Sequence, residues 1–361
     1  MRSQLTALIL VYLSFSGSVF AQYDIDSLYE HDPVFKVHFD SIKGSLSIFD
    51  GKDPLRIILI SDFRNLHKEK FDREYQEAEM KVYFQDTLVV TRSVKIQPRG
   101  KNRLSTCYYP PLKINFKKGD MLLDQMKDFD KIKLVKPCKS GVLYEDYIRN
   151  EYLIYKVYQL LEPDYSFRVR QLEVTYIDTS GKSKPNVVPS FLIENSNELA
   201  KRTNSIPIET KGLNSNYMNR SRSDVMSVFQ FMIGNTDWSV PGLHNMKIFK
   251  YNDPNEKLVV AVPYDFDYSG VVNTGYAVPF EELGLSSVRE RLYRGFCGEP
   301  GDIENAIDII RSKKGEILKL YADSQFAKES YQKNSLKYLN EFFAIAENDR
   351  MAKNQIIRAC R

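Results

Sequence analysis

Residues 223–270 read SDVMSVFQFMIGNTDWSVPGLHNMKIFKYNDPNEKLVVAVPYDFDYSG. Apolar residues recur at helical spacing up to Gly234, which predicts a helix that ends there. A polar loop containing Asp237 follows, and then come two apolar runs, 246–251 and 258–264, separated by the sequence NDPN. These runs predict a β-hairpin, because Asn, Asp and Pro favour turns between strands.

The predicted hairpin brings two polar residues together at its open end. Asn245 precedes the first strand and Asp265 follows the second, and antiparallel pairing makes such residues neighbours. An amide oxygen and a carboxylate suit a divalent cation that also carries phosphate oxygens. We therefore expect Asn245 and Asp265 to hold a metal ion beside Asp237. Asp267 competes with Asp265, and Asp265 is preferred because it directly ends the strand.

The order of these motifs resembles that of a known enzyme family. The run IGNTD, then HN, then PYDFD is similar to the catalytic and metal-binding segments of the spore coat protein H (CotH) family of atypical kinases, and to those of HipA-type kinases. Sequences around residues 99–103, 111–113 and 191–194 are also placed as in CotH-like proteins, so the similarity covers roughly residues 95 to 270. The resemblance implies a two-lobed, protein-kinase-like fold that uses ATP or another nucleotide with Mg²⁺ or Mn²⁺.

Two features depart from the ordinary kinase pattern. Seven residues separate Asp237 from Asn245, which is longer than the usual catalytic loop. The sequence also has no GxGxxG motif, so coverage of the nucleotide phosphates by glycine backbone is not supported, although CotH-like proteins resemble this chain in lacking it.

The resemblance implies roles in phosphoryl transfer for several residues. Asp237 would orient or deprotonate the acceptor hydroxyl. Lys113 lies in an alternating run that predicts a strand, and Arg99 lies in a basic turn before it, so these two would neutralise the phosphates. Lys133 and Lys136 are the alternatives to Lys113, which could also be an ordinary solvated lysine on a strand face.

Two glutamates complete the expected nucleotide site. Helical periodicity predicts a helix at residues 144–161, and Glu151 on it would pair with the phosphate-binding lysine as in a kinase N-lobe. The alternative is a plain surface glutamate. Glu194 ends a predicted strand, 186–193, at the passage that matches the linker between kinase lobes, where the adenine would bind.

The N-terminal region and the cysteines indicate export. Residues 1–21 contain Arg2, a short apolar run and a small-residue end, which predicts a secretory signal peptide cleaved after Ala21 and no transmembrane span thereafter. A secreted or periplasmic location makes the four cysteines candidates for disulfides. Of the three possible pairings, we prefer Cys107 with Cys138 and Cys297 with Cys360, because each pair lies within one predicted region.

The remaining pattern predicts an α+β protein. Residues 22–95 are expected to form an extended arm up to about residue 54, followed by a β-rich extension with strands at 55–62, 77–84 and 87–97. Residues 96–195 would form the kinase-like N-lobe. Residues 196–361 would form the C-lobe, which is helical from residue 302 onward.

The charge balance and the motifs also bear on functions other than phosphoryl transfer. The chain has 51 Lys and Arg against 47 Asp and Glu, a balance too even to indicate nucleic-acid binding. Paired acids such as Asp265 and Asp267 also occur in glycoside hydrolases, but nothing else predicts carboxyls about 5 to 9 Å apart across a sugar cleft. The expected substrates are Ser or Thr hydroxyls of exported proteins or a small surface metabolite. The alternative to a kinase is a catalytically inactive, kinase-like surface scaffold or binding protein.

Overall fold

The computed structural model describes residues 25–43, 48 and 49, 54–84, 87–100, 102–116, 130–324 and 328–360. The predicted signal peptide lies outside these ranges. The described chain combines helices and strands, so the α+β prediction is confirmed. Its largest sheet is a closed barrel, which does not by itself establish a two-lobed kinase arrangement.

Seven strands form the barrel in the order β1-β2-β3-β4-β5-β7-β6, and parallel pairing of β1 with β6 closes it. The strands are β1 (Leu55–Ser61), β2 (Gln76–Phe84), β3 (Thr87–Pro98), β4 (Leu112–Asn115), β5 (Lys131–Val135), β6 (Val169–Asp178) and β7 (Asn186–Ile193). Alternate residues point inward and form one hydrophobic cluster, which includes Leu59, Ile96 and Val174. The strands expected at 55–62, 77–84 and 87–97 are thus confirmed. Strand β3 crosses the boundary expected at residue 95, and the strands on both sides of it belong to the same barrel.

The expectation of an extended arm is wrong for residues 25–43. This segment forms α1 (Ile25–His31) and α2 (Pro33–Lys43). Asp32 starts α2, since its Oδ1 accepts hydrogen bonds from the backbone N–H groups of Val34 and Phe35 at 2.9 and 3.0 Å, and proline suits the first helical position. Two further short helices, α3 (Phe63–Lys68) and α4 (Asn102–Thr106), cover connections of the barrel.

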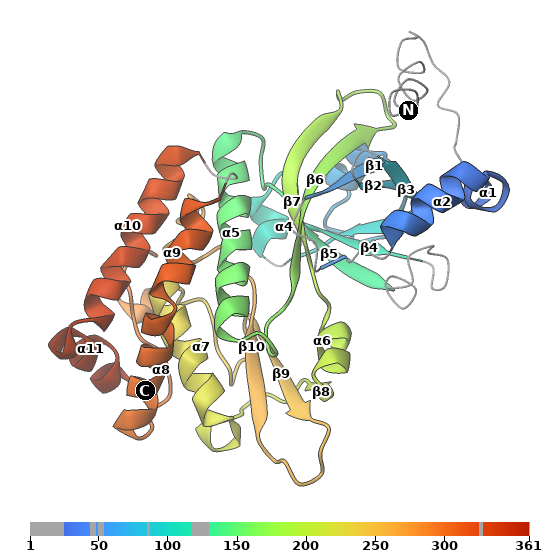
Figure 1. The fold of residues 1–361 in the computed structure, drawn as a ribbon. Coiled ribbons are helices and arrows are strands. Elements are labelled where there is room, and N and C mark those ends of the chain that lie inside the picture. Colours follow the sequence, from blue (N-terminus) through green and yellow to red (C-terminus); the bar gives the residue numbers. More distant parts are fainter. Residues whose placement is uncertain are drawn as a thin grey trace, which may run out of the picture.

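Apart from β6 and β7, the chain from residue 142 onward is mainly helical and lies beside the barrel (Figure 1). Its helices are α5 (Val142–Leu161), α6 (Ser196–Arg202), α7 (Arg220–Ile233), α8 (Pro300–Ser312), α9 (Lys314–Ala322), α10 (Glu329–Ala346) and α11 (Asp349–Gln355). A three-stranded antiparallel sheet consists of β8 (Ser205–Ile208), β9 (Met246–Tyr251) and β10 (Val259–Pro263), with β9 in the middle. The predicted hairpin, the helix predicted at residues 144–161 and the helix predicted to end at Gly234 are confirmed.

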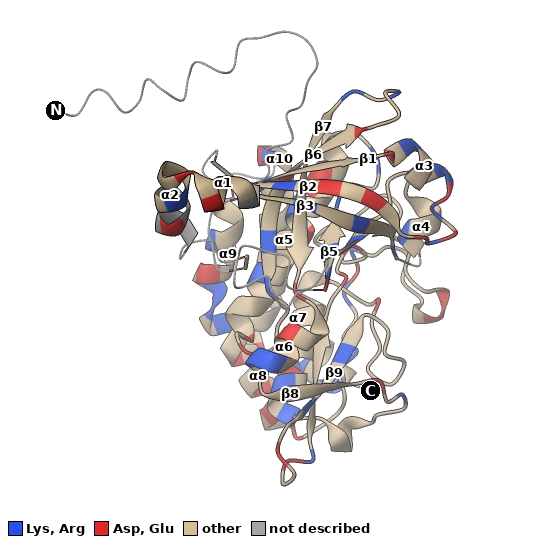
Figure 2. Cartoon of the chain, turned by 90° about the vertical axis from the view of Figure 1, so that its right-hand side faces the viewer, with Lys and Arg blue, Asp and Glu red and all other residues tan. Residues whose placement is uncertain are grey.

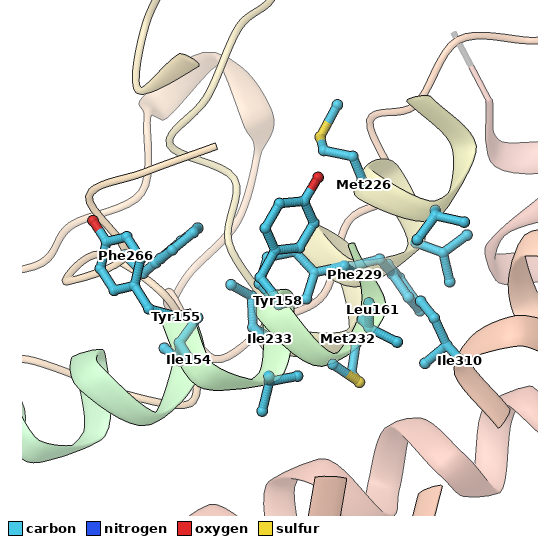
Figure 3. Close-up of a cluster of buried hydrophobic side chains, with 14 of the residues drawn as sticks. Ile154, Tyr155, Tyr158, Leu161, Met226, Phe229, Met232, Ile233, Phe266 and Ile310 are labelled. Carbon is cyan, nitrogen blue, oxygen red and sulfur yellow. The ribbon is translucent and has the colours of Figure 1, made fainter. Parts of the chain in front are cut away.

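Helix α5 stands between the barrel and the other helices, and its apolar face packs on α7 (Figures 1 and 3). Tyr158 of α5 and Phe229 of α7 have ring centroids 4.6 Å apart. Gly234 ends α7 with a left-handed φ of 66°, and a Cβ atom there would lie 1.9 Å from the hydroxyl of Tyr338. Both the turn and the close approach of α10 therefore require glycine at this position.

Both preferred disulfides are formed, Cys107 with Cys138 and Cys297 with Cys360. No helix in the described part of the chain is long and apolar enough to cross a membrane. Basic and acidic residues are interspersed along the barrel strands and the helices in Figure 2, in keeping with the even charge balance.

Candidate functional site

Asn245 and Asp265, which flank the two strands of the β9–β10 hairpin, lie next to each other in space at its open end. The carbonyl of Asn245 accepts a hydrogen bond from the N–H of Tyr264 at 3.0 Å, and Asp265 is the next residue. Asn245 and Asp265 both have left-handed backbones, with φ of 51° and 64°, a conformation that non-glycine residues adopt infrequently. The N–H of Asp265 donates to the hydroxyl of Tyr155 at 2.9 Å, so α5 holds this turn in place.

Asp237 lies in the loop after α7 and is held on both carboxylate oxygens. Its Oδ1 is 2.6 Å from Nε2 of His244, and its Oδ2 accepts a hydrogen bond from Nδ2 of Asn245 at 2.9 Å. Nδ2 of Asn245 also donates to the backbone carbonyl of Asp237 at 2.8 Å, which leaves the amide oxygen of Asn245 as its remaining polar atom. Asp237 is 8% exposed, and burial raises its pKa although His244 opposes the shift.

A buried arginine that sequence reasoning did not assign to the site connects two of the predicted site residues. Arg103, on α4, donates through Nη2 to Glu151 at 2.6 Å and through Nε to Asp267 at 2.7 Å. The second acid, Asp267, also accepts a hydrogen bond from the hydroxyl of Tyr276 at 3.0 Å. Glu151 therefore pairs with an arginine instead of a lysine, and burial raises its pKa to about 7 while Arg103 opposes the shift.

The two carboxylates after β10 differ in availability. Oδ2 of Asp267 is occupied by Arg103 and Tyr276, and burial raises the pKa of this group. The carboxylate of Asp265 is half-buried and makes no hydrogen bond or ion pair with the residues that the structure describes. Asp265 is thus the acid of the two with oxygens available to a ligand. Since Asp267 is neutralised by Arg103, the two acids do not form a free carboxylate pair.

Two cations lie near Asp265. Nε of Arg99 is buried without a hydrogen-bond partner within the described ranges, and Asp265 is its strongest favourable charge interaction. Lys133, on β5, lies with Nζ 4.8 Å from the ring centroid of Tyr264. Burial, with Arg99 as the next cause, lowers the pKa of Lys133 to about 7.

Lys113 occupies the neighbouring position on the sheet. It is paired directly with Lys133 in the register of β4 and β5, so both side chains emerge on the same face. Nζ of Lys113 lies 5.2 Å from the ring centroid of Tyr75. Of the lysines considered from the sequence, Lys133 is the one that interacts electrostatically with Asp265.

Glu194 does not have a free side chain for a nucleotide. It is fully buried, and its Oε1 accepts hydrogen bonds from Nε of Arg168 at 2.9 Å and from Nε of Arg202 at 3.1 Å. Its Oε2 accepts from the backbone N–H of Arg168 and from Nη2 of Arg202, both at 3.1 Å. Through these contacts the carboxylate of Glu194 joins the end of β7 to α6.

The described residues contain no cluster of three or more His, Cys, Asp or Glu side chains that could hold a metal ion. A Mg²⁺ ion that arrives with a nucleotide does not need such a cluster, because it is bound by one or two protein oxygens together with phosphates and water. The free carboxylate of Asp265 and the amide oxygen of Asn245 fit that requirement.

No protein-family model matches the chain, and no curated protein matches it significantly. The resemblance to CotH-type and HipA-type kinases is therefore an expectation from the sequence motifs alone.

Proposed function

We propose that this protein is a metal-dependent phosphotransferase with a two-lobed, kinase-like arrangement. The barrel with α5 would serve as the N-lobe, and α7 to α11 with the hairpin as the C-lobe. The proposed reaction transfers the terminal phosphoryl group of ATP, or of another nucleotide, to a Ser or Thr hydroxyl of an exported protein or to a small surface metabolite. The observation that carries this proposal is the free carboxylate of Asp265, which follows the hairpin opposite Asn245 and has the cations Arg99 and Lys133 nearby.

The two cations suit the nucleotide phosphates. A buried guanidinium with an unpartnered N–H is costly unless a ligand supplies an acceptor, and phosphate is a good acceptor for arginine. Lys133 gains charge when an anion approaches, because a nearby negative charge raises the pKa of an amine. Arg99 and Lys133 together therefore provide a site for anions beside Asp265.

A bound Mg²⁺ or Mn²⁺ ion would neutralise charge on the phosphates and would be held by Asp265 and Asn245. Asn245 is positioned for this role by its two hydrogen bonds to Asp237, which fix the side-chain amide. The same contacts fix the carboxylate of Asp237 next to the proposed metal ligand. Loss of Asn245 would therefore affect both groups.

Asp237 is suited to accept the proton of the attacking hydroxyl. In the proposed step the acceptor oxygen forms a bond to the terminal phosphorus, the bond from that phosphorus to the bridging oxygen breaks, and the hydroxyl proton passes to Asp237. Burial raises the pKa of Asp237, which makes its carboxylate a better proton acceptor than an exposed aspartate. Arg103 stabilises the site indirectly, because its ion pairs join Glu151 of α5 to Asp267, which follows the hairpin in sequence.

Binding of Mg·ATP to the purified protein tests the proposal first. We expect calorimetry to detect metal-dependent binding, and Asp265→Asn to weaken it at least about tenfold, which corresponds to roughly 1.4 kcal/mol. Asp253→Asn is the matched control, since Asp253 lies exposed in the turn at the opposite end of the same hairpin. Equal affinities for both variants would remove Asp265 from the metal site.

Transfer of radiolabelled phosphate then separates the enzyme from the scaffold. With casein as a generic acceptor, and with autophosphorylation followed in parallel, Asp237→Asn should retain nucleotide binding and lose on the order of 10² to 10⁴ of the transfer rate. Binding without any transfer by the wild-type protein would favour the inactive scaffold. Absence of binding with Mg²⁺ or Mn²⁺ and either ATP or GTP would overturn the proposed nucleotide site.

A further inference from the structure

A cavity of about 640 Å³ lies on the barrel away from the hairpin. Its walls come from α3, from the ends of β6 and β7, and from the segment that joins β5 to α5. Its lining includes Lys136, which the sequence offered as an alternative to Lys113, but none of the residues proposed above for the nucleotide, the metal or proton transfer. We refer to it as the Lys136 pocket, after the lysine in its wall.

Lys136 is 5% exposed and faces aromatic rings instead of acids. Its Nζ lies 4.0 Å from the ring centroid of Tyr176, 5.2 Å from that of Tyr109 and 5.8 Å from that of Phe63. It forms no ion pair or hydrogen bond with any residue in the described ranges. A buried amine without a counter-ion is costly, and its burial lowers the pKa to about 7. An anionic ligand would supply the missing counter-ion.

A second buried group in the same wall also lacks a partner. Nε2 of His67 is buried without a hydrogen bond within the described part of the chain. The imidazole packs against the rings of Tyr108 and Tyr109, with centroid distances of 5.5 and 4.7 Å. Burial, with Lys136 as the next cause, lowers the pKa of His67 to about 3, so the ring is neutral at physiological pH. It can exchange a hydrogen bond with a ligand without adding charge.

The rim of the Lys136 pocket is basic and the inside is aromatic. Four exposed cations line the rim without a carboxylate partner among the described residues, namely Arg64, Lys139, Lys182 and Lys184. The two acids in the lining, Glu145 and Asp178, are each engaged: Glu145 by Arg149, and Asp178 by Ser180. The net charge of the lining therefore attracts anions, and its tyrosine rings offer surfaces on which a flat ring can stack.

The tyrosines are held in a fixed position. The disulfide between Cys107 and Cys138 joins the residue before Tyr108 to the segment that follows Lys136. The N–H of Tyr109 donates to the carbonyl of Cys138 at 3.0 Å. A ligand would thus enter a pocket whose walls are already ordered, which lowers the entropic cost of binding.

We propose that the Lys136 pocket is a second ligand site, which binds a small organic anion that carries an aromatic ring. The anionic group pairs with the Lys136 ammonium, and the ring stacks among Tyr108, Tyr109 and Tyr176. This site is independent of the proposed phosphotransferase site, because the two share no residue.

Naphthalene-2-sulfonate, an aromatic anion, is the probe for direct binding. We expect calorimetry to detect one site per chain, at least tenfold weaker binding by Lys136→Met, and less than a threefold change for Lys139→Met. Lys139 is the matched control, since it lies on the rim of the same pocket and is exposed. Equal affinities for both variants, or no binding by the wild-type protein, would overturn the proposal.

Chemical trapping on the unmodified protein avoids dependence on a variant. The uncharged amine of a lysine attacks the aldehyde carbon of pyridoxal 5′-phosphate, a C–N bond forms, the carbonyl oxygen leaves as water, and borohydride then reduces the imine to a stable secondary amine. At limiting reagent, peptide mapping should find Lys136 modified at least tenfold more than Lys139, and naphthalene-2-sulfonate should protect Lys136 alone. Preferential modification of exposed lysines, or no protection by the sulfonate, would contradict the site.

Discussion

Nε of Arg103 lies 2.7 Å from Oδ2 of Asp267, although the two residues are 164 positions apart in the chain. The same guanidinium donates to Glu151, so a single cation neutralises two buried acids. Arg103→Met leaves both acids without a cationic partner, and removal of one member of a buried ion pair costs ~3–5 kcal/mol. We expect the free energy of unfolding, measured by urea denaturation, to fall by that amount.

Arg311→Met is the control for this substitution. Arg311 and Asp308 form an ion pair of the same length, 2.7 Å, but both side chains are exposed. Exposed pairs contribute ~0–1 kcal/mol, so this variant should lose little stability. Similar losses in both variants would show that the burial of Arg103 is not the source of its effect.

Lys133 should make nucleotide binding depend on pH. Its pKa of about 7 leaves the amine mostly uncharged at pH 8, and a bound phosphate favours the charged form. Binding at pH 8 should therefore take up protons, and the affinity should fall as the pH rises from 6.5 to 8.5. Calorimetry in two buffers with different ionisation enthalpies measures this uptake.

Lys113→Met and Lys133→Met form a matched pair, since the two lysines are directly opposite in the register of β4 and β5. We expect only Lys133→Met to abolish proton uptake and to weaken nucleotide binding at least about tenfold, or roughly 1.4 kcal/mol. The reverse result would return the phosphate-binding role to Lys113.

The helices and strands around the site could be predicted wherever a short stretch of sequence determines them. The hairpin follows from two apolar runs around NDPN, and antiparallel pairing is enough to bring Asn245 near Asp265. The choice between Lys113 and Lys133 could not be made, because both lie in short alternating runs and their surroundings depend on contacts between strands. For α2, the Asp-Pro signal at its start was present in the sequence and was missed.

Non-local contacts explain the remaining gaps. Alternation predicts that a segment is a strand, but it does not say which strand pairs with it, so closure of the barrel by β1 and β6 was not predicted. Glu151 was expected to meet a lysine, and the cation that it contacts comes from a different element, 48 positions earlier. Burial of a glutamate on a helix face can be read from periodicity, whereas its partner cannot.

The disulfide between Cys297 and Cys360 joins the segment before α8 to the chain after α11, with a sequence separation of 63. A double Cys→Ser variant should lose ~2–4 kcal/mol of unfolding free energy, since the bond restricts a long loop in the unfolded chain. Removal of Cys107–Cys138, with a separation of 31, should cost about 0.6 kcal/mol less on loop length alone. Peptide mapping that joins Cys107 to Cys297 would contradict both pairs.

Lys136 should reduce the stability of the folded protein in a pH-dependent way. Its pKa is about 7 in the folded protein and about 10.5 in an unfolded chain, so the unfolded state binds more protons between these values and stability rises with pH across this window. The free-energy cost of the buried amine is complete below pH 7 and disappears above about pH 10.5.

Lys136→Met should therefore raise the free energy of unfolding by ~1–4 kcal/mol at pH 6.5, and by less at pH 9.5. Urea denaturation at the two pH values measures both changes. A loss of stability at pH 6.5, or the same gain at both pH values, would contradict the burial of an unpaired amine. The expected gain would mean that the chain retains Lys136 at the expense of stability. Residues that bind ligands are commonly retained at such a cost.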